Sequence, residues 1–245
     1  MAKEEKENGE LVKTGVFGLD DLFYGGIPRG SVTVVGGAPG TGKTNVALQF
    51  IYEGARKFGE TGVYITIEES AKDIRANGMK FGWDIEKLEK QGLVKIVELP
   101  IYESGTNVIA QIPQIIKDAG AKRVALDSLT LLNYLYRDES ARRTGLLMFI
   151  KAVKINNCTA LVTAETKRDF PKLEYTPEFS LADGAIILFW SRRGQVVERA
   201  IWVMKMRGRR IMTKVAMLDI TDTGVVVYPD RMLYTLETEQ GKVRR

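Results

Sequence analysis

The sequence of 245 residues contains no histidine and a single cysteine, Cys158. Without histidine, no Ser-His-Asp triad, Cys–His dyad or other imidazole acid–base chemistry can operate. A lone cysteine allows neither an intramolecular disulfide nor a zinc site built from several thiolates. Any catalysis must therefore depend on carboxylates, lysine, arginine, hydroxyl groups and backbone amides.

Long hydrophobic runs are also missing. No apolar run approaches 18 residues, the length from which a membrane-spanning helix is inferred. Residues 1–10 (MAKEEKENGE) are highly charged and lack the apolar centre of a signal peptide. We therefore expect a cytoplasmic protein without a membrane partner. We expect one domain at residues 13–232, with a flexible tail at 1–12 and another tail at 233–245.

The net charge of +5 is unevenly distributed along the chain. Between residues 192 and 214, eight Lys or Arg residues accompany a single acid, Glu198, so this basic window carries the whole positive excess. Basic clusters bind phosphate groups, but in a strand-rich region they also form solvated faces. The basic window is therefore a candidate contact for nucleic acid, for a subunit interface or for solvent.

Segments with the pattern of buried strands alternate with segments of helical spacing over the first two thirds of the chain. Strands are expected at 31–36, 62–67, 93–98, 123–126 and 159–163, and helices at 43–58, 71–79, 84–90, 106–119 and 139–155. Ser70 and Asp84 are the candidate N-caps of two of these helices. The alternation predicts an α/β fold with a mainly parallel central sheet and flanking helices.

After Ala164 the pattern changes. Residues 165–180 (ETKRDFPKLEYTPEFS) contain two prolines and many charges, which predicts a long functional loop. Strands without intervening helices are then expected at 184–190, 195–206, 211–218 and 224–228, separated by turns that contain glycine. We expect antiparallel hairpins that extend the sheet at its C-terminal side.

Residues 37–44 match the phosphate-loop pattern G-x-x-x-x-G-K-[ST] between a predicted strand and a predicted helix. Glycines let backbone N–H groups approach phosphate oxygens, and the helix N-terminus adds partial positive charge. Lys43 is expected to reach the β- and γ-phosphates, and the Thr44 hydroxyl to bind Mg²⁺. The predicted nucleotide-binding residues are Gly37, Ala38, Pro39, Gly40, Thr41, Gly42, Lys43 and Thr44.

Hydrolysis of a nucleotide also needs a second anchor for the metal and a group that orients water. Asp127 follows the apolar strand expected at 123–126, where an ionised carboxylate is costly unless a cation compensates it. The alternative role for Asp127 is the N-cap of a following helix.

Glu68 and Glu69 follow another strand of the predicted parallel sheet, at the edge where ligands bind in such sheets. Two adjacent carboxylates repel, which is expected to raise the pKa of one and make it a better proton acceptor. The alternative is a surface acid pair that begins a loop.

Together these motifs resemble the KaiC-like branch of the RecA-type ATPases. Residues 14–22 (TGVFGLDDL) and 25–30 (GGIPRG) lead into the phosphate loop, and the blocks at 68–69 (EE), 126–128 (LDS), 181–184 (LADG) and 205–208 (KMRG) follow in order. The chain differs from the circadian clock protein, which has two such domains, because it contains one phosphate loop and no repeat. It also lacks the histidine that often follows the KMRG block.

The resemblance implies a RecA-like core, ATP and Mg²⁺ as cofactors, and a homo-oligomeric ring, a hexamer, with ATP between neighbouring subunits. It implies that Glu68 and Glu69 activate water, and that Lys205 and Arg207 reach the γ-phosphate held by the adjacent subunit. We accordingly expect a slow ATPase with a regulatory role. The sequence does not identify a protein client.

Two other functions use the same motifs. One is an ATP-modulated, single-stranded DNA-binding accessory protein of recombination or repair, and the other is a nucleotide-switched scaffold with little hydrolysis. In the first case the basic window would follow the nucleic-acid backbone, and Phe170, Tyr175 and Phe179 would stack on bases. The same aromatic residues would also suit a subunit interface.

Overall fold

The centre of the molecule is a nine-stranded sheet, seen in a computed structural model that describes residues 10–99, 108–131, 138–167, 171–172, 174, 176–193 and 195–231. The strand order is β11-β10-β9-β8-β3-β7-β6-β4-β5. The strands are β3 (Val32–Gly37), β4 (Gly62–Thr66), β5 (Val94–Glu98), β6 (Arg123–Asp127), β7 (Thr159–Glu165), β8 (Gly184–Arg193), β9 (Val196–Met206), β10 (Ala216–Thr221) and β11 (Gly224–Tyr228).

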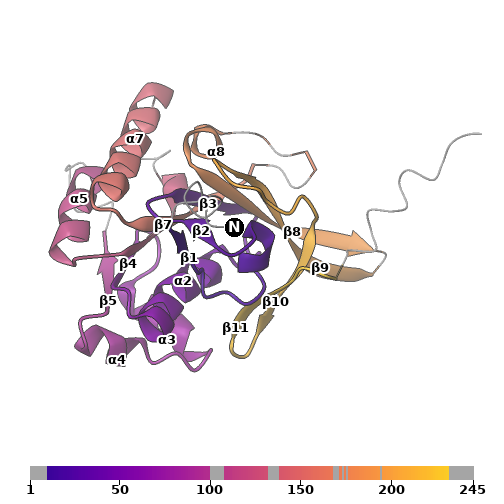
Figure 1. Cartoon of the computed structure of the whole chain (residues 1–245), viewed down its shortest axis with the longest axis horizontal. Coiled ribbons are helices and arrows are strands. Elements are labelled where there is room, and N and C mark those ends of the chain that lie inside the picture. Colours follow the sequence, from indigo (N-terminus) through magenta and orange to yellow (C-terminus); the bar gives the residue numbers. More distant parts are fainter. Residues whose placement is uncertain are drawn as a thin grey trace, which may run out of the picture.

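Pairing within this sheet is parallel on one side and antiparallel on the other. Strands β8, β3, β7, β6, β4 and β5 pair in parallel, whereas β8 to β11 pair as consecutive antiparallel strands. The predicted α/β fold, with a mainly parallel sheet and C-terminal antiparallel hairpins, is confirmed. The antiparallel strands extend away from the helical layers (Figure 1).

Helices cover both faces of the parallel part of the sheet (Figure 1). One face packs against α2 (Lys43–Phe58), α3 (Ala71–Met79) and α4 (Ile85–Lys90), and the other against α5 (Val108–Asp118) and α7 (Glu139–Ile155). Side chains alternate between these two cores, so that Val63 and Ile65 face α5 and α7 while Tyr64 faces α2. None of the described helices is long and apolar enough to cross a bilayer.

Several element boundaries differ from those expected. Leu11 and Val12, expected in the tail, form β1, which pairs with β2 (Ile27–Pro28). Residues 177–180 of the expected loop, together with Leu181, form the short helix α8 (Pro177–Leu181), which begins with a proline in its first turn. Strand β10 begins at Ala216 rather than at 211. The caps at Ser70 and Asp84 are confirmed, because both side chains accept a backbone N–H three residues later.

A buried arginine connects α2 to the sheet. Arg123 on β6 is 1% exposed, its Nη2 lies 2.6 Å from Oε2 of Glu60, and its Nη1 donates to the Phe50 carbonyl at 3.1 Å. The second oxygen of Glu60 accepts from Arg29 at 2.7 Å. Burial alone would raise the pKa of Glu60, but the two arginines lower it below its usual value. The carboxylate is thus ionised while it compensates the buried guanidinium.

We expect Glu60→Gln to lower the free energy of unfolding by about 3 kcal/mol, because it leaves the Arg123 charge buried and unpaired. Glu89→Gln is the matched control: its partner Arg75 is 31% exposed, so about 1 kcal/mol or less is expected. Urea unfolding at several pH values measures both. Because the folded pKa of Glu60 is lowered, its contribution is complete above the unfolded pKa of about 4.3 and disappears as pH falls through the folded pKa. Equal losses for the two variants at neutral pH would contradict this role.

Candidate functional site

The loop 37–44 joins the end of β3 to the first turn of α2, as predicted. Gly42 has φ 104°, a left-handed conformation that glycine adopts without strain. A Cβ atom at Gly37 would lie 2.4 Å from the Leu188 carbonyl oxygen, so only glycine allows β8 to pack this closely. The buried Thr41 hydroxyl donates to the Ala38 carbonyl at 2.8 Å and closes the loop. The result is a tight turn at a helix N-terminus, the geometry that binds phosphate.

Lys43 folds back over this loop. Its Nζ donates to the carbonyl oxygens of Gly37 at 2.9 Å and Ala38 at 3.1 Å. Burial lowers the pKa of Lys43, while the nearby carboxylates, first Glu165 and then Asp127, act in the opposite direction. A partly buried ammonium group at this position can exchange the loop carbonyls for phosphate oxygens.

A cavity of about 180 Å³ adjoins the loop at the carboxyl edge of the parallel strands. It brings together residues from the phosphate loop, the start of α2 and the carboxyl ends of β4, β6 and β7, which are far apart in the sequence. Lys43, Thr44, Glu68, Glu69 and Asp127 all lie on its wall. The described residues of its lining are Pro39, Gly40, Lys43, Thr44, Thr66, Glu68, Glu69, Asp127, Ser128 and Glu165.

Asp127 ends β6 between its two neighbouring strands. The Tyr64 hydroxyl on β4 donates to Oδ2 of Asp127 at 2.5 Å, and the Thr163 hydroxyl on β7 donates to Oδ1. Burial, and then the charge of Asp127, hold the pKa of Tyr64 well above its usual value. Both carboxylate oxygens of Asp127 thus accept from hydroxyl groups in the sheet, which favours a site role over the N-cap alternative.

The two glutamates that follow β4 have different partners. Glu68 accepts a hydrogen bond of 2.5 Å from the Ser128 hydroxyl, beside Asp127. Glu69 accepts from Asn77 of α3 at 3.1 Å, and its backbone N–H donates to Thr66. Burial, and then Asp127, raise the pKa of Glu69. The raised pKa fits the expectation for an acid pair, but its main cause is burial rather than repulsion from Glu68.

Lys205 and Arg207 lie at the opposite, amino edge of the parallel strands. Lys205 pairs with Ala185, which adjoins Val34, three residues and about 10 Å before Gly37. Both side chains bind backbone carbonyls at the end of α8: Lys205 those of Ser180 and Ala182, and Arg207 those of Ser180 and Leu181. Burial, and then Arg207, lower the pKa of Lys205. The structure thus separates this pair from the phosphate loop of the same chain.

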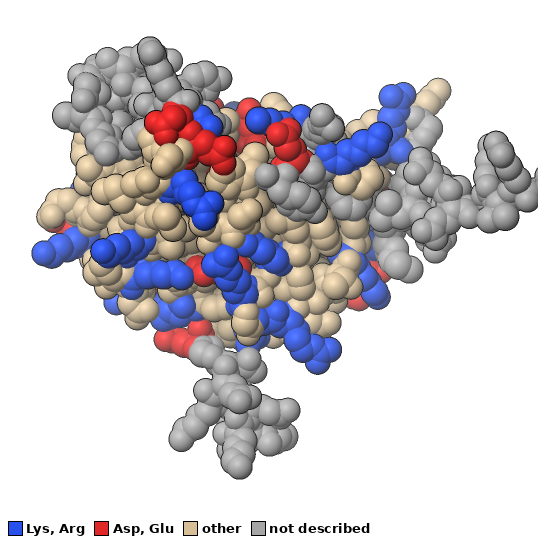
Figure 2. Space-filling view, turned by 90° about the horizontal axis from the view of Figure 1, so that it is seen from above, with Lys and Arg blue, Asp and Glu red and all other residues tan. Residues whose placement is uncertain are grey.

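Lys and Arg side chains are spread across one face of the molecule, with a smaller acidic group toward one edge (Figure 2). One member of the basic window contacts the phosphate loop directly. Arg199 donates from Nε to the Gly40 carbonyl at 3.2 Å, and its guanidinium lies 4.4 Å from the Trp190 ring centre. Arg199 was not identified by sequence reasoning, because its approach depends on the long β8–β9 hairpin.

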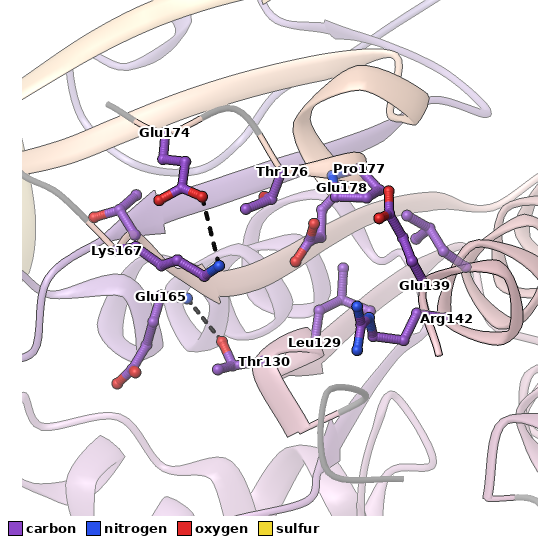
Figure 3. A pocket seen from close by; sticks show the side chains of 12 residues that line it. Leu129, Thr130, Glu139, Arg142, Glu165, Lys167, Glu174, Thr176, Pro177 and Glu178 are labelled. Carbon is purple, nitrogen blue, oxygen red and sulfur yellow. Dashed lines mark hydrogen bonds and ion pairs between the residues drawn. The ribbon is translucent and has the colours of Figure 1, made fainter. Parts of the chain in front are cut away.

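A second cavity, of about 370 Å³, lies beside the first, between η2 (Leu129–Leu131), α7, the end of β7 and α8 (Figure 3). Glu165 belongs to the walls of both cavities. Among its described residues, the second wall contains more carboxylates than cations, and Lys167 pairs with Glu174 at 3.5 Å. Its described charged residues are Glu139, Glu165, Glu174, Glu178, Arg142 and Lys167. This acidic excess opposes a nucleic-acid backbone.

Of the three aromatic residues expected to stack on bases, one is buried and two lie outside the described residues. Phe179 of α8 is 3% exposed and packs in the core against Gly36, so it cannot stack on a ligand. Phe170 and Tyr175 lie outside the described residues. The structure thus removes one of the three residues on which the nucleic-acid alternative depended.

Besides Arg199, sequence reasoning assigned no site role to five residues that line the first cavity or support it: Tyr64, Thr66, Ser128, Thr163 and Glu165. Thr163 ends a predicted parallel strand and Glu165 follows it, which is the signal that identified Asp127. Tyr64 gives no such signal, because a tyrosine inside a buried strand reads as core.

Comparison with known proteins agrees with these features. The family described as "ATPase: KaiC" matches residues 12–232. A UPF0273 protein of Aeropyrum pernix is 35% identical over 246 residues, which cover 91% of this chain and 96% of the other. The circadian clock oscillator protein KaiC of Parathermosynechococcus lividus is 33% identical over 227 residues, which cover 89% of this chain but 42% of the clock protein.

A solved structure has the same fold. The KaiC-like protein of the hyperthermophilic archaeon Pyrococcus horikoshii superimposes with a TM-score of 0.81 at 35% identity. The match covers 90% of this chain and all of the other chain. The resemblance inferred from the motifs is therefore confirmed along most of the sequence.

Proposed function

The chain belongs to the KaiC family of ATPases, proteins that bind ATP on a RecA-like fold, and we propose that it hydrolyses Mg-ATP between the subunits of a homo-oligomeric ring. The observation that carries this proposal is the 180 Å³ cavity where the phosphate loop meets Asp127 and Glu68. A phosphate cradle, a metal anchor and a water-orienting carboxylate are the parts that phosphoryl transfer to water requires. We assign the ATPase domain to residues 13–232.

Mg²⁺ suits the oxygen donors on this wall. The Thr44 hydroxyl and the Asp127 carboxylate line the same cavity, and Mg²⁺ prefers hard oxygen ligands together with substrate phosphates. These two residues would hold the ion in the nucleotide complex. When bound, Mg²⁺ supplies positive charge that neutralises the phosphate oxygens. Lys43 and the loop amides contribute the remaining positive field from the protein.

Glu68 is the better placed of the two candidate bases. The Ser128 hydroxyl fixes its carboxylate next to Asp127, and its charge acts on Lys43. Glu68 would orient a water whose oxygen attacks the γ-phosphorus and would accept its proton as the bond to the ADP oxygen breaks. Glu69 would support this arrangement by connecting the strand end to α3 through Asn77.

Lys205 and Arg207 would complete the site of the neighbouring subunit. Their position at the amino edge, directed at their own α8 carbonyls, supports a role in trans rather than in cis. Positive charge near the transferred phosphoryl group lowers the barrier. An isolated chain would lack this contribution and hydrolyse ATP slowly, so we propose a ring, of six subunits as the family resemblance implies, as the active form. We infer a regulatory role, in which the nucleotide state controls the ring and a protein client responds.

Mixing two inactive variants tests the ring site. Lys43→Ala retains the cation pair, whereas the double variant Lys205→Ala, Arg207→Ala retains the phosphate loop. We expect each alone to hydrolyse ATP at least about tenfold more slowly, since one charged hydrogen bond contributes about 1.5 kcal/mol. Phosphate release should recover on mixing, because some sites then combine both intact halves. Lys214→Ala, an exposed lysine of the same basic window, is the control for general loss of charge.

The mixing result distinguishes a cation pair that acts on the neighbouring subunit's ATP from a pair that lies outside the catalytic site. Recovery after subunit exchange supports cations in trans, whereas no recovery, with both variants assembled, would place the pair outside the catalytic site. Absence of Mg-dependent ATP hydrolysis by the unaltered protein would overturn the proposed function itself. Size measurements with ATP and with ADP then show whether nucleotide controls the ring.

A further inference from the structure

The carboxylate of Asp127 is fixed by its two neighbouring strands. Tyr64 of β4 and Thr163 of β7 donate to different oxygens of Asp127, one from each side of β6. The three side chains share the face of the sheet that packs on α2, because Tyr64 pairs with Ala125, two residues before Asp127. The carboxylate is therefore held across the sheet at the wall of the phosphate cavity.

The donors are rigid. Tyr64 is fully buried in the core between the sheet and α2, so its ring cannot swing away and its hydroxyl has one position. Thr163 is also fully buried, and a β-branched side chain in a strand has few rotamers. A water molecule in either place would exchange and reorient, whereas these hydroxyl groups do not.

We propose that Tyr64 and Thr163 are positioning residues that clamp Asp127 in the orientation in which it holds Mg²⁺. The inference rests on the proposed function, and it assigns the metal affinity of the site to two residues that do not contact the metal. Hydrogen bonds that orient a metal-binding carboxylate typically change metal affinity by about 10- to 100-fold. The two hydrogen bonds to Asp127 thus affect the affinity for Mg²⁺ and leave the phosphate loop unaltered.

The experiment measures how Mg²⁺ strengthens binding of a fluorescent, non-hydrolysable ATP analogue. Tyr64→Phe removes a single oxygen atom. We expect it to raise, about tenfold, the Mg²⁺ concentration that gives half of the maximal increase in affinity for the analogue. Affinity for the analogue in EDTA should stay within about twofold of the unaltered protein. Thr163→Val should act in the same direction, and Thr163→Ser, which keeps the hydroxyl, should restore the original Mg²⁺ requirement.

Two control variants remove buried hydroxyl groups elsewhere. Tyr52→Phe alters a buried tyrosine that stacks on Trp83, away from the cavity. Thr33→Val removes a buried hydroxyl without a hydrogen-bond partner among the described residues. Both should leave the Mg²⁺ requirement unchanged. Thermal melts of all variants separate this effect from simple loss of stability, because a purely structural role would change melting and not the Mg²⁺ requirement.

A double-mutant cycle tests whether Tyr64 acts on the metal through Asp127. If Tyr64 acts through Asp127, Tyr64→Phe should change the Mg²⁺ requirement less than about twofold when Asp127 is already Asn. A full tenfold effect in that background, or an unchanged requirement in folded Tyr64→Phe and Thr163→Val proteins, would overturn the clamp. Both results leave the proposed function standing, whereas failure of the unaltered protein to bind Mg-ATP would overturn the function.

Discussion

Replacing Lys43 with alanine is expected to raise the dissociation constant for ATP by at least about 100-fold. The ammonium group already donates two hydrogen bonds to loop carbonyls, and in the complex these donors turn to phosphate oxygens. Hydrogen bonds to charged groups contribute about 1.5–3 kcal/mol each, so loss of two corresponds to about two orders of magnitude or more. Calorimetry or a fluorescent ATP analogue measures the change.

The matched control for Lys43 lies on the same helix. Lys57→Ala removes an exposed lysine near the other end of α2, where the ammonium group pairs with Glu53. ATP binding should stay unchanged, since Lys57 does not line the phosphate cavity. Wild-type affinity in a folded Lys43→Ala protein would remove the loop 37–44 from nucleotide binding and end the functional proposal.

The second large effect is expected on turnover. Glu68→Gln should lower kcat by about 10²- to 10⁴-fold and leave ATP affinity within about threefold, because glutamine keeps the shape of the side chain but accepts no proton. Glu69→Gln should lower kcat less, by about tenfold, since Glu69 mainly connects the strand end to Asn77 of α3. Steady-state phosphate release and ATP binding in separate assays give the two quantities.

The pair of variants also distinguishes the two carboxylates. A larger loss in Glu69→Gln than in Glu68→Gln would reverse the assignment, because both glutamates line the cavity. Unchanged turnover in the double variant would remove both from the mechanism. Glu86→Gln, an exposed acid of α4, controls for surface charge and should match the unaltered protein.

Local sequence signals predicted the elements that form the nucleotide cavity. The bounds of α2, α3 and α7 agree with the expected helices, because each has helical spacing and, for α3, the predicted cap Ser70 marks the start. Asp127, Glu68 and Glu69 were found because parallel strands bring their carboxyl ends to one edge. That rule places side chains near each other without knowledge of the folded chain.

The features that were missed depend on tertiary contacts. Strands β1 and β2 are two residues each and exist only as partners of each other, so no periodicity announces them. Phe179 lies in a charged, proline-containing segment typical of a loop, yet it fills the space left by Gly36. Tyr64 has the pattern of a core residue, and its hydrogen bond to Asp127 depends on the register of β4 and β6. Local patterns carry no information on such long-range pairs.

The position of α8 has a consequence for communication between the sites of the proposed ring. Its Phe179 packs on Gly36, immediately before the phosphate loop, and its last carbonyls hold Lys205 and Arg207. The residues of one short helix thus contact both the strand that leads into the phosphate loop and the two cations that we propose act at the neighbouring subunit's site. In the proposed ring, a displacement of α8 when the loop binds phosphate would release these cations, and binding at one site would then change hydrolysis at the next.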